Sequence, residues 1–228
     1  MATILSLECA TGLTSVAVHE NGRCVGYATT PLPQAASSQL MPLVDQVMHT
    51  AAVGSGQLQA VAVSAGPGSY TGLRIGAATA KGICYALRLP LLAVNTLEIL
   101  LQEVSSHPVS APCYLCPMID ARRMEVYCSL YTHTGTPVLP VDARIINSDS
   151  FQEFLDQHPV YFFGDGAAKC QPLLQHPHAH FIAGIAPSAQ AMGPLAWRLW
   201  QEQQFSNLAT FEPVYLKEFI AKKPKPFF

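Results

Sequence analysis

The order of predicted strands and helices occurs twice along this chain, and that repetition limits most strongly what the sequence can fold into. Short apolar runs predict strands, and apolar residues at helical spacing predict helices. In the first half these are strands at 4–8, 15–20 and 23–28, a helix at 40–51, a strand at 59–64, a helix at 71–87 and a strand at 90–94. Asn21-Gly22 joins the second and third strands and is typical of a type I′ hairpin turn, because both central positions need positive φ.

After a proline-containing stretch at 105–112, which predicts a linker, the order repeats in outline. The segments are strands at 113–119, 125–131 and 138–146, a helix at 149–157, a strand at 160–163 and a final amphipathic helix at 187–204. A strand-strand-strand-helix-strand order that occurs twice predicts an α/β fold, a duplicated unit of two lobes with mixed sheets. We expect an N-terminal lobe at 1–104 with a helix returning to it at about 187–216, a C-terminal lobe at 105–186, and a flexible tail at 217–228.

Composition and charge argue against several classes of protein. Half of the 228 residues are hydrophobic, 12% are charged, and the net charge is −2. Lys and Arg are sparse outside the last 12 residues, which argues against an RNA-binding module. No apolar run approaches the roughly 18 residues that span a bilayer, and the start lacks the basic region of a signal peptide. Seven cysteines, an odd number, do not suggest a disulfide framework. We therefore expect a reduced, cytoplasmic protein with no membrane contact.

The most informative segment is the glycine-rich loop from Ser64 to Arg74, between a predicted strand and a predicted helix. Such loops often bind phosphate, because backbone N–H groups and the helix dipole point at the anion. Three specific versions fail on spacing: a P-loop and a dinucleotide fingerprint need glycine at Thr71, and a nucleophile elbow around Ser69 needs glycine at Pro67 and Thr71. Spacing alone favours a rigid turn that starts a helix, with Thr71 or Ser69 as N-cap, over anion binding.

The same loop closely resembles the signature of the TsaB (YeaZ) family, Gly-Pro-Gly-Ser-(Phe/Tyr)-Thr-Gly-(Leu/Val)-Arg. The matching residues are Gly66, Pro67, Gly68, Ser69, Thr71, Gly72 and Arg74. Three further segments resemble family motifs in the family's order: the opening strand and turn at 5–11, a C-terminal motif at 212–216, and a central motif with Asp120, Arg122, Glu125 and Tyr127. The resemblance spans nearly the whole chain, and the combination of four ordered motifs is specific.

This resemblance implies both a fold and a role. The fold is the duplicated, RNase H-like fold of actin, Hsp70 chaperones and sugar kinases. The role is that of a non-catalytic assembly subunit beside TsaD, which transfers threonylcarbamoyl to the adenosine next to the anticodon of tRNAs that read codons beginning with A. The resemblance also implies the TsaE ATPase as a further partner, a homodimer when the chain is alone, and only indirect contact with tRNA. We expect no cofactor in the isolated chain and a possible nucleotide at the subunit junction.

Two departures from the family pattern bear on the alternative of an enzyme. Glu8 stands where the family usually has aspartate, and Mg²⁺ tolerates little geometric error, which argues against an ATP-dependent kinase. Ala35-Ala36 replaces a usual Glu-His pair, and the predicted first helix contains only His49. A glycopeptidase-type metalloprotease would need a defined ligand set, which we do not find.

Other candidate sites have structural interpretations that we prefer. Cys113 and Cys116 lie at i and i+3 of a predicted strand, on opposite faces, which favours two buried thiols over a metal site. His176, His178 and His180 are expected in a solvated loop. Asp120 and Arg122 are expected to form an ion pair that fixes a turn. We expect packing roles for Tyr127 and for Trp197 and Trp200.

The helix after the glycine loop carries an unusual number of small residues. Its apolar stripe, Leu73, Ala77, Ala80, Cys84 and Leu87, is expected to face the core. Glycine costs about 1 kcal/mol of helix propensity relative to alanine, so small residues on another face suggest the close approach of a partner helix. The predicted partner interface consists of Met41, Asp45, Gly72, Ile75, Gly76, Thr79 and Gly82.

Overall fold

The structure is a computed structural model that describes residues 2–30 and 36–217. Its first half forms a five-stranded sheet with the order β3-β2-β1-β4-β5. β1 pairs antiparallel with β2 and parallel with β4, and β4 pairs parallel with β5. The elements are β1 (Thr3–Glu8), β2 (Thr14–Glu20), β3 (Arg23–Thr30), α1 (Ala36–Thr50), β4 (Ala60–Ser64), α2 (Tyr70–Leu87), β5 (Leu91–Val94) and α3 (Thr96–Val104).

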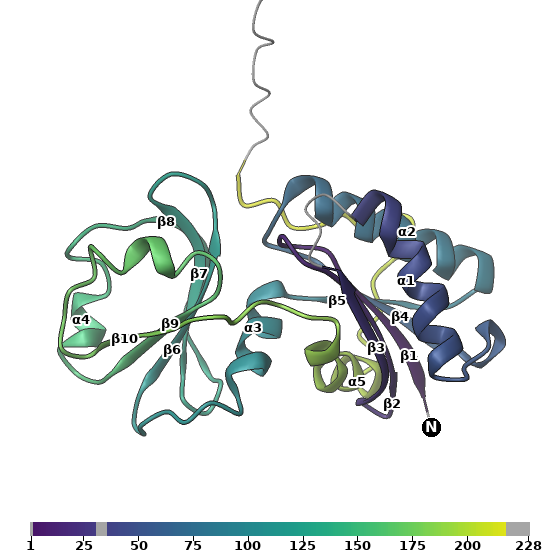
Figure 1. Ribbon diagram of the computed structural model, residues 1–228, viewed down its shortest axis with the longest axis horizontal. Coiled ribbons are helices and arrows are strands. Elements are labelled where there is room, and N and C mark those ends of the chain that lie inside the picture. Colours follow the sequence, from purple (N-terminus) through teal and green to yellow (C-terminus); the bar gives the residue numbers. More distant parts are fainter. Residues whose placement is uncertain (1, 31–35, 218–228) are drawn as a thin grey trace, which may run out of the picture.

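The second half repeats this topology in a sheet with the order β10-β9-β6-β7-β8. Its elements are β6 (Tyr114–Asp120), β7 (Glu125–Thr132), β8 (Pro137–Ile145), α4 (Gln152–Leu155), β9 (Val160–Phe163) and β10 (Ala179–Ile182), and α5 (Gly193–Gln201) follows. In both sheets an antiparallel three-stranded meander continues into two parallel strands. The two sheets form separate lobes (Figure 1), so the predicted duplicated α/β fold is confirmed.

The N-terminal sheet is covered on both faces, because its strands carry apolar side chains on both sides. Leu5 and Leu7 point to the face covered by α1 and α2. Ile4 points to the other face, where it packs with Leu195 and Ala196 of α5. Figure 1 shows this layering, with α1 and α2 on one side of the sheet and α5 on the other. The returning helix thus completes the N-terminal lobe.

Helix α3 lies between the two sheets and packs on both (Figure 1). Ile99 belongs to the same apolar cluster as α5. Leu97 and Leu100 pack with Leu115 and Phe163 of the C-terminal sheet. The lobes are therefore joined by a helix whose opposite sides are buried in different cores.

Several elements differ from their predicted extents. Helix α5 is shorter than 187–204, and α4 spans only four residues of the predicted helix at 149–157. Strand β10 was not predicted. The start of α5 is fixed by close packing, because a Cβ at Gly193 would lie 2.5 Å from Cδ2 of the buried His19. His19 bonds Ser6 Oγ (3.1 Å) and the carbonyl oxygen of Gln190 (3.1 Å), and burial lowers its pKa.

Over the described residues, none of the helices combines the length and the apolar character that a membrane crossing requires. The predicted tail lies outside the described residues from 218 onward, and its first residue, Lys217, is described and contacts the C-terminal lobe.

Candidate functional site

The glycine-rich loop connects β4 to α2 and packs on the turn that follows β1. Of the two predicted N-cap residues, Thr71 and Ser69, the structure has Ser69 at the N-cap of α2. Its Oγ accepts a hydrogen bond from the backbone N–H of Gly72 (3.3 Å). The backbone N–H of Ser69 donates to the carbonyl oxygen of Ala10 (2.7 Å). The loop and the first turn are thus held together as one unit.

Two glycines of this loop are required by close approach of the first turn. A Cβ at Gly68 would lie 2.3 Å from the carbonyl oxygen of Ala10, and a Cβ at Gly72 would lie 2.0 Å from that of Cys9. Carbonyl oxygens, which carry partial negative charge, are therefore packed against the start of α2, where an anion would bind. This arrangement favours the rigid turn over a phosphate cradle.

Glu8, the departure from the family pattern, lies at the end of β1 and is completely buried. Its Oε1 accepts a hydrogen bond from the backbone N–H of Ala10 (2.5 Å), whereas Oε2 has no partner among the described residues. Burial raises the pKa of Glu8 from 4.5 to about 7, although the bonds from Ala10 and Ser64 oppose the shift. The carboxyl group of Glu8 is inaccessible, and backbone carbonyl oxygens pack closely against Gly68 and Gly72. This arrangement does not fit a Mg²⁺–nucleotide site within this chain.

The central motif forms a tight loop between β6 and β7. The carboxylate of Asp120 pairs with the ammonium of Lys169 and accepts the backbone N–H of Arg122 (2.8 Å). Lys169 also donates to the carbonyl oxygens of Arg123 (2.8 Å) and Glu125 (2.6 Å). The predicted Asp120–Arg122 ion pair is therefore wrong: Arg122 contributes its backbone, and the cation comes from a residue 49 positions away.

Replacing Lys169 by methionine is expected to destabilise the protein by about 2 kcal/mol, because the substitution leaves a carboxylate and two carbonyl oxygens without their shared donor. Urea unfolding measures this difference. Arg198→Met is the control, since the Arg198–Glu98 pair is exposed and is expected to contribute less than about 1 kcal/mol. Equal losses in the two variants would contradict the anchoring role of Lys169.

Several other side chains have the packing roles that were predicted. Cys113 and Cys116 are buried free thiols. Tyr127 is half-buried against the apolar cluster around α3. Trp200 packs on the cluster beneath α5, and Trp197 lies against Gly22.

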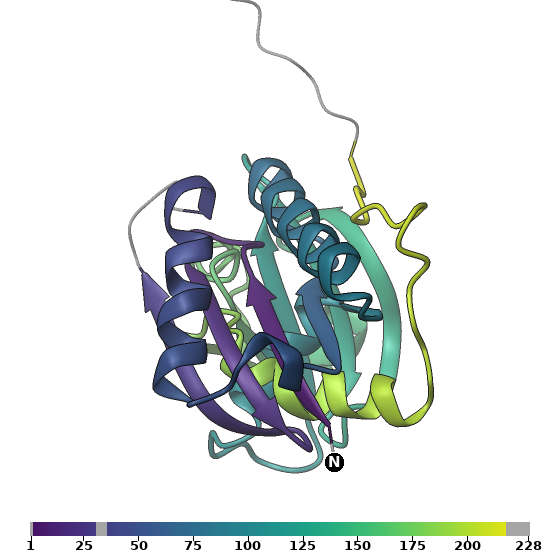
Figure 2. The same ribbon diagram turned by 90° about the vertical axis from the view of Figure 1, so that its right-hand side faces the viewer.

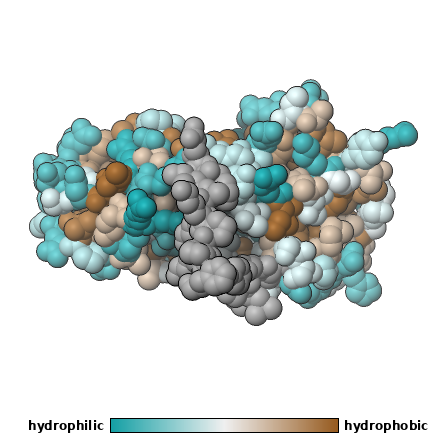
Figure 3. Space-filling view, turned by 90° about the horizontal axis from the view of Figure 1, so that it is seen from above, coloured by the Kyte–Doolittle hydropathy of each residue, from teal (hydrophilic) through white to brown (hydrophobic). Residues whose placement is uncertain are grey.

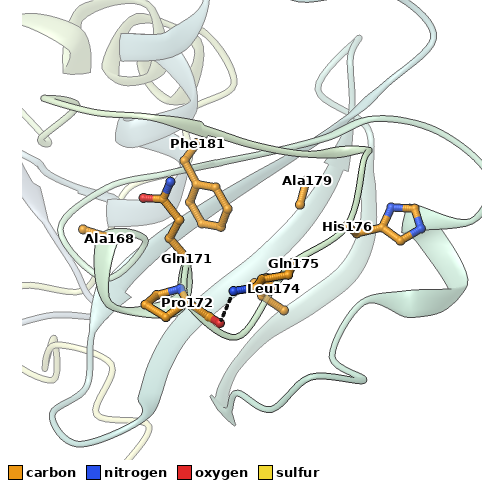
Figure 4. A pocket seen from close by; sticks show the side chains of 8 residues that line it. All are labelled: Ala168, Gln171, Pro172, Leu174, Gln175, His176, Ala179 and Phe181. Atoms are coloured by element: carbon orange, nitrogen blue, oxygen red, sulfur yellow. Dashed lines mark hydrogen bonds between the residues drawn. The ribbon is translucent and has the colours of Figure 1, made fainter.

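The prediction that the three histidines lie in a solvated loop is wrong in part. His180 belongs to β10 and stacks on Tyr161, with ring centroids 5.0 Å apart. His178 Nδ1 lies 2.7 Å from the carbonyl oxygen of Leu155. His176 lines a cavity of about 410 Å³ with Gln171, Gln175 and Phe181 (Figure 4). No cluster of three or more metal-ligating side chains occurs in residues 2–30 and 36–217.

The structure buries some residues of the predicted partner interface and leaves others exposed. Gly72 and Gly76 are buried within the N-terminal lobe, and a Cβ at Gly76 would lie 3.4 Å from Val63 Cγ2. The expectation that small residues at these positions serve the approach of a partner helix is therefore wrong for Gly72 and Gly76, which pack inside the lobe. Gly82 is exposed with nothing within 4 Å of a Cβ position, and Ile75 and Thr79 are half-buried.

The outward face of α1 and α2 combines exposed apolar and small side chains, mainly on α2, with polar side chains, mainly on α1. Tyr85 is 80% exposed and Met41 is 47% exposed. Exposed Ala78, Gly82 and Ala86 add a small-residue stripe to α2. The charged side chains of the two helices are Asp45, Arg74 and Lys81, and Lys81 donates to the carbonyl oxygens of Phe211 (3.1 Å) and Ala209 (3.4 Å). Seen from above, this half of the molecule shows pale and brown side chains interspersed with hydrophilic ones (Figure 3).

Comparisons with known proteins identify the family to which the chain belongs. A family model described as TsaD, tRNA N6-adenosine threonylcarbamoyltransferase, matches residues 32–223. The tRNA threonylcarbamoyladenosine biosynthesis protein TsaB of Escherichia coli is 25% identical over 98% of each chain. The structure of YeaZ from Pseudomonas aeruginosa matches with a TM-score of 0.81 at 28% identity, covering 95% of this chain and 100% of that one.

A threonylcarbamoyltransferase itself matches part of the chain. The tRNA N6-adenosine threonylcarbamoyltransferase of Legionella pneumophila is 37% identical over 91 residues, which cover 38% of this chain and 27% of that one. Proteins named TsaB or YeaZ match nearly the whole chain. The chain therefore belongs to the family that the threonylcarbamoyltransferase model describes, as a member of its TsaB (YeaZ) group of tRNA threonylcarbamoyladenosine biosynthesis proteins.

Proposed function

We propose that this chain is a non-catalytic subunit that binds a TsaD-type threonylcarbamoyltransferase through the outward face of α1 and α2 and so supports threonylcarbamoyl modification of tRNA. The observation that carries the proposal is the exposure of two large apolar side chains, Tyr85 of α2 and Met41 of α1, together with exposed small residues along α2. Aromatic side chains and methionine are enriched in protein interfaces, and charged residues are depleted at their centres. Small residues allow a partner helix to approach closely.

Sequence similarity to transferases supports a partner of the same fold. The partial match to the Legionella enzyme indicates that such a partner has a related lobe. A related lobe would supply an equivalent helix pair, so that four helices could pack about a pseudo-twofold axis. The same face would pair two copies of this chain when no transferase is present. We propose further that a TsaE-type ATPase joins this complex, that any nucleotide at the subunit junction is held mainly by the partner, and that tRNA is contacted indirectly.

The geometry at the end of β1 supports a role without chemistry of its own. A kinase of this fold would need an accessible carboxylate for Mg²⁺ and free N–H groups for phosphate. Glu8 is instead buried with a raised pKa, and carbonyl oxygens of the first turn fill the start of α2. The metalloprotease alternative has no comparable support among the described side chains.

Gly82→Glu is expected to weaken transferase binding at least 100-fold while leaving the chain folded. The new side chain has open space in the isolated protein, but in the complex it would place a carboxylate inside an apolar contact. Isothermal calorimetry with the purified transferase measures the affinity, and circular dichroism checks the fold. Gly76, whose substitution would disturb the core, is not suited to this test.

Gly56→Glu is the matched control, because Gly56 is also exposed with nothing within 4 Å of its Cβ position and lies outside both helices. It is expected to bind the transferase like the wild type. Equal affinity of both glutamate variants and the wild type would place the transferase contact elsewhere on the chain.

A further inference from the structure

We infer that residues 206–217, the C-terminal strap, act as a latch that holds the two lobes at a fixed angle. The strap follows α5 and runs up one side of the N-terminal lobe (Figure 2) to the space between the two lobes (Figure 1). The chain itself crosses between the lobes twice, between α3 and β6 and between β10 and α5. The strap adds a third, non-covalent connection.

The strap is fixed to the N-terminal lobe along its length. The backbone N–H of Ser206 donates to the carbonyl oxygen of Leu91 (2.8 Å), and that of Val214 donates to the carbonyl oxygen of Ala65 (2.8 Å). Gly66 permits this approach, since a Cβ there would lie 2.7 Å from the carbonyl oxygen of Val214. The strap therefore moves with the N-terminal lobe up to Val214.

An aromatic contact continues this attachment at the start of α2. The rings of Tyr215 and Tyr70 lie 4.9 Å apart, and Arg74 Nη1 donates to the hydroxyl of Tyr70 (2.8 Å). Two residues later the strap meets the other lobe. The ammonium of Lys217 pairs with the carboxylate of Glu125 and lies 3.3 Å from the carbonyl oxygen of Ala121.

The C-terminal lobe presents these two acceptors in a prearranged loop. Ala121 N–H donates to the carbonyl oxygen of Glu125 (3.1 Å), and the ammonium of Lys169 donates to the same carbonyl oxygen (2.6 Å). The backbone that carries both acceptors is thus fixed by contacts other than those of Lys217, which favours a defined contact over a mobile surface pair. The side chain of Glu125 is 20% exposed, so solvent screens the ion pair only in part.

The ion pair between Lys217 and Glu125 lies where it can restrain the angle between the lobes most effectively. Helix α3 is packed in both cores and forms the pivot, whereas the strap crosses at the other end of the space between the sheets (Figure 1). Small rotations about a hinge produce their largest displacements far from it. A bond between Lys217 and Glu125 therefore restrains opening more effectively than a bond beside α3.

The test removes each side of the latch and measures both the strap and the lobes. Lys217→Ala and Glu125→Ala are each expected to speed hydrogen exchange of the Val214 amide about five-fold, the effect of losing one partly exposed ion pair. Single-molecule energy transfer reports the lobe angle. Its labels replace exposed Glu202 and Ser148, one on each lobe, through non-natural residues because the chain contains seven cysteines.

Wild-type protein is expected to give one narrow distribution of distances between the labels, and either single variant a broader one. The double variant is expected to match the single variants, because they remove the same contact. Arg198→Ala, which removes an ion pair that does not cross between the lobes, is expected to leave the distribution narrow. Unchanged distances in Lys217→Ala would overturn the inference, even if Val214 exchanged faster.

Discussion

Gly72→Ala is expected to destabilise the protein by about 3 kcal/mol or more, although alanine is the better helix former. The added Cβ would lie 2.0 Å from the carbonyl oxygen of Cys9, a backbone atom that cannot move without shifting the end of β1. Because Ser69 and Ala10 tie the same turn to the start of α2, the shift would spread through the loop. Urea unfolding monitored by circular dichroism measures the loss of stability.

Gly82→Ala in the same helix is the control. Nothing lies within 4 Å of its Cβ position, so the higher helix propensity of alanine is expected to stabilise the protein by about 0.5–1 kcal/mol. The two identical substitutions should therefore have opposite signs. Similar stability of both variants would mean that the first turn does not pack on α2 as described.

Glu8→Gln is expected to stabilise the protein more at pH 8 than at pH 5, with a difference of about 2–3 kcal/mol. Burial raises the pKa of Glu8 from 4.5 in the unfolded chain to about 7 in the folded protein. Between these values the folded state holds a proton that the unfolded state has lost, so the stability of the wild type falls as pH rises from about 4.5 to about 7. Glutamine keeps an acceptor for the Ala10 N–H and cannot ionise.

The comparison is made by urea unfolding of wild type and Glu8→Gln at several pH values, since all other titrating groups are shared and cancel. Glu202→Gln, an exposed substitution at the end of α5, is expected to show no comparable trend. A constant difference between wild type and Glu8→Gln from pH 5 to pH 8 would show that Glu8 is already ionised at pH 5 in the folded protein, so that burial does not raise its pKa.

Local sequence signals predicted most of the fold where the controlling interactions are also local. Asn21 and Gly22 both adopt positive φ, as the hairpin turn between β2 and β3 requires. Strand β10 carried no such signal, because it has only four residues and lies at the edge of its sheet. Helix α5 was predicted too long because Gly193 is fixed by a contact with His19, 174 positions earlier in the sequence.

Prediction of the candidate site from the sequence was limited in the same way, to features that local interactions determine. Spacing along α2 separated an apolar stripe from a small-residue stripe, but it could not show that Gly72 and Gly76 face the end of β1 and β4. That assignment depends on how closely α2 approaches the sheet. Likewise, Lys169 as the partner of Asp120 follows from the pairing of two loops that are distant in sequence. The exposed part of the face, including Met41, Asp45 and Gly82, remains a predicted interface.

The most direct test of the central claim is a reconstituted assay of threonylcarbamoyl transfer to tRNA. The cognate transferase and its remaining partners are supplied with wild-type chain, Gly82→Glu, Gly56→Glu or no chain, and modified adenosine is quantified by mass spectrometry. We predict that wild type and Gly56→Glu support modification, that Gly82→Glu falls to the level seen without the chain, and that the chain without transferase produces none. Full activity with Gly82→Glu, or modified tRNA from the chain alone, would contradict the account.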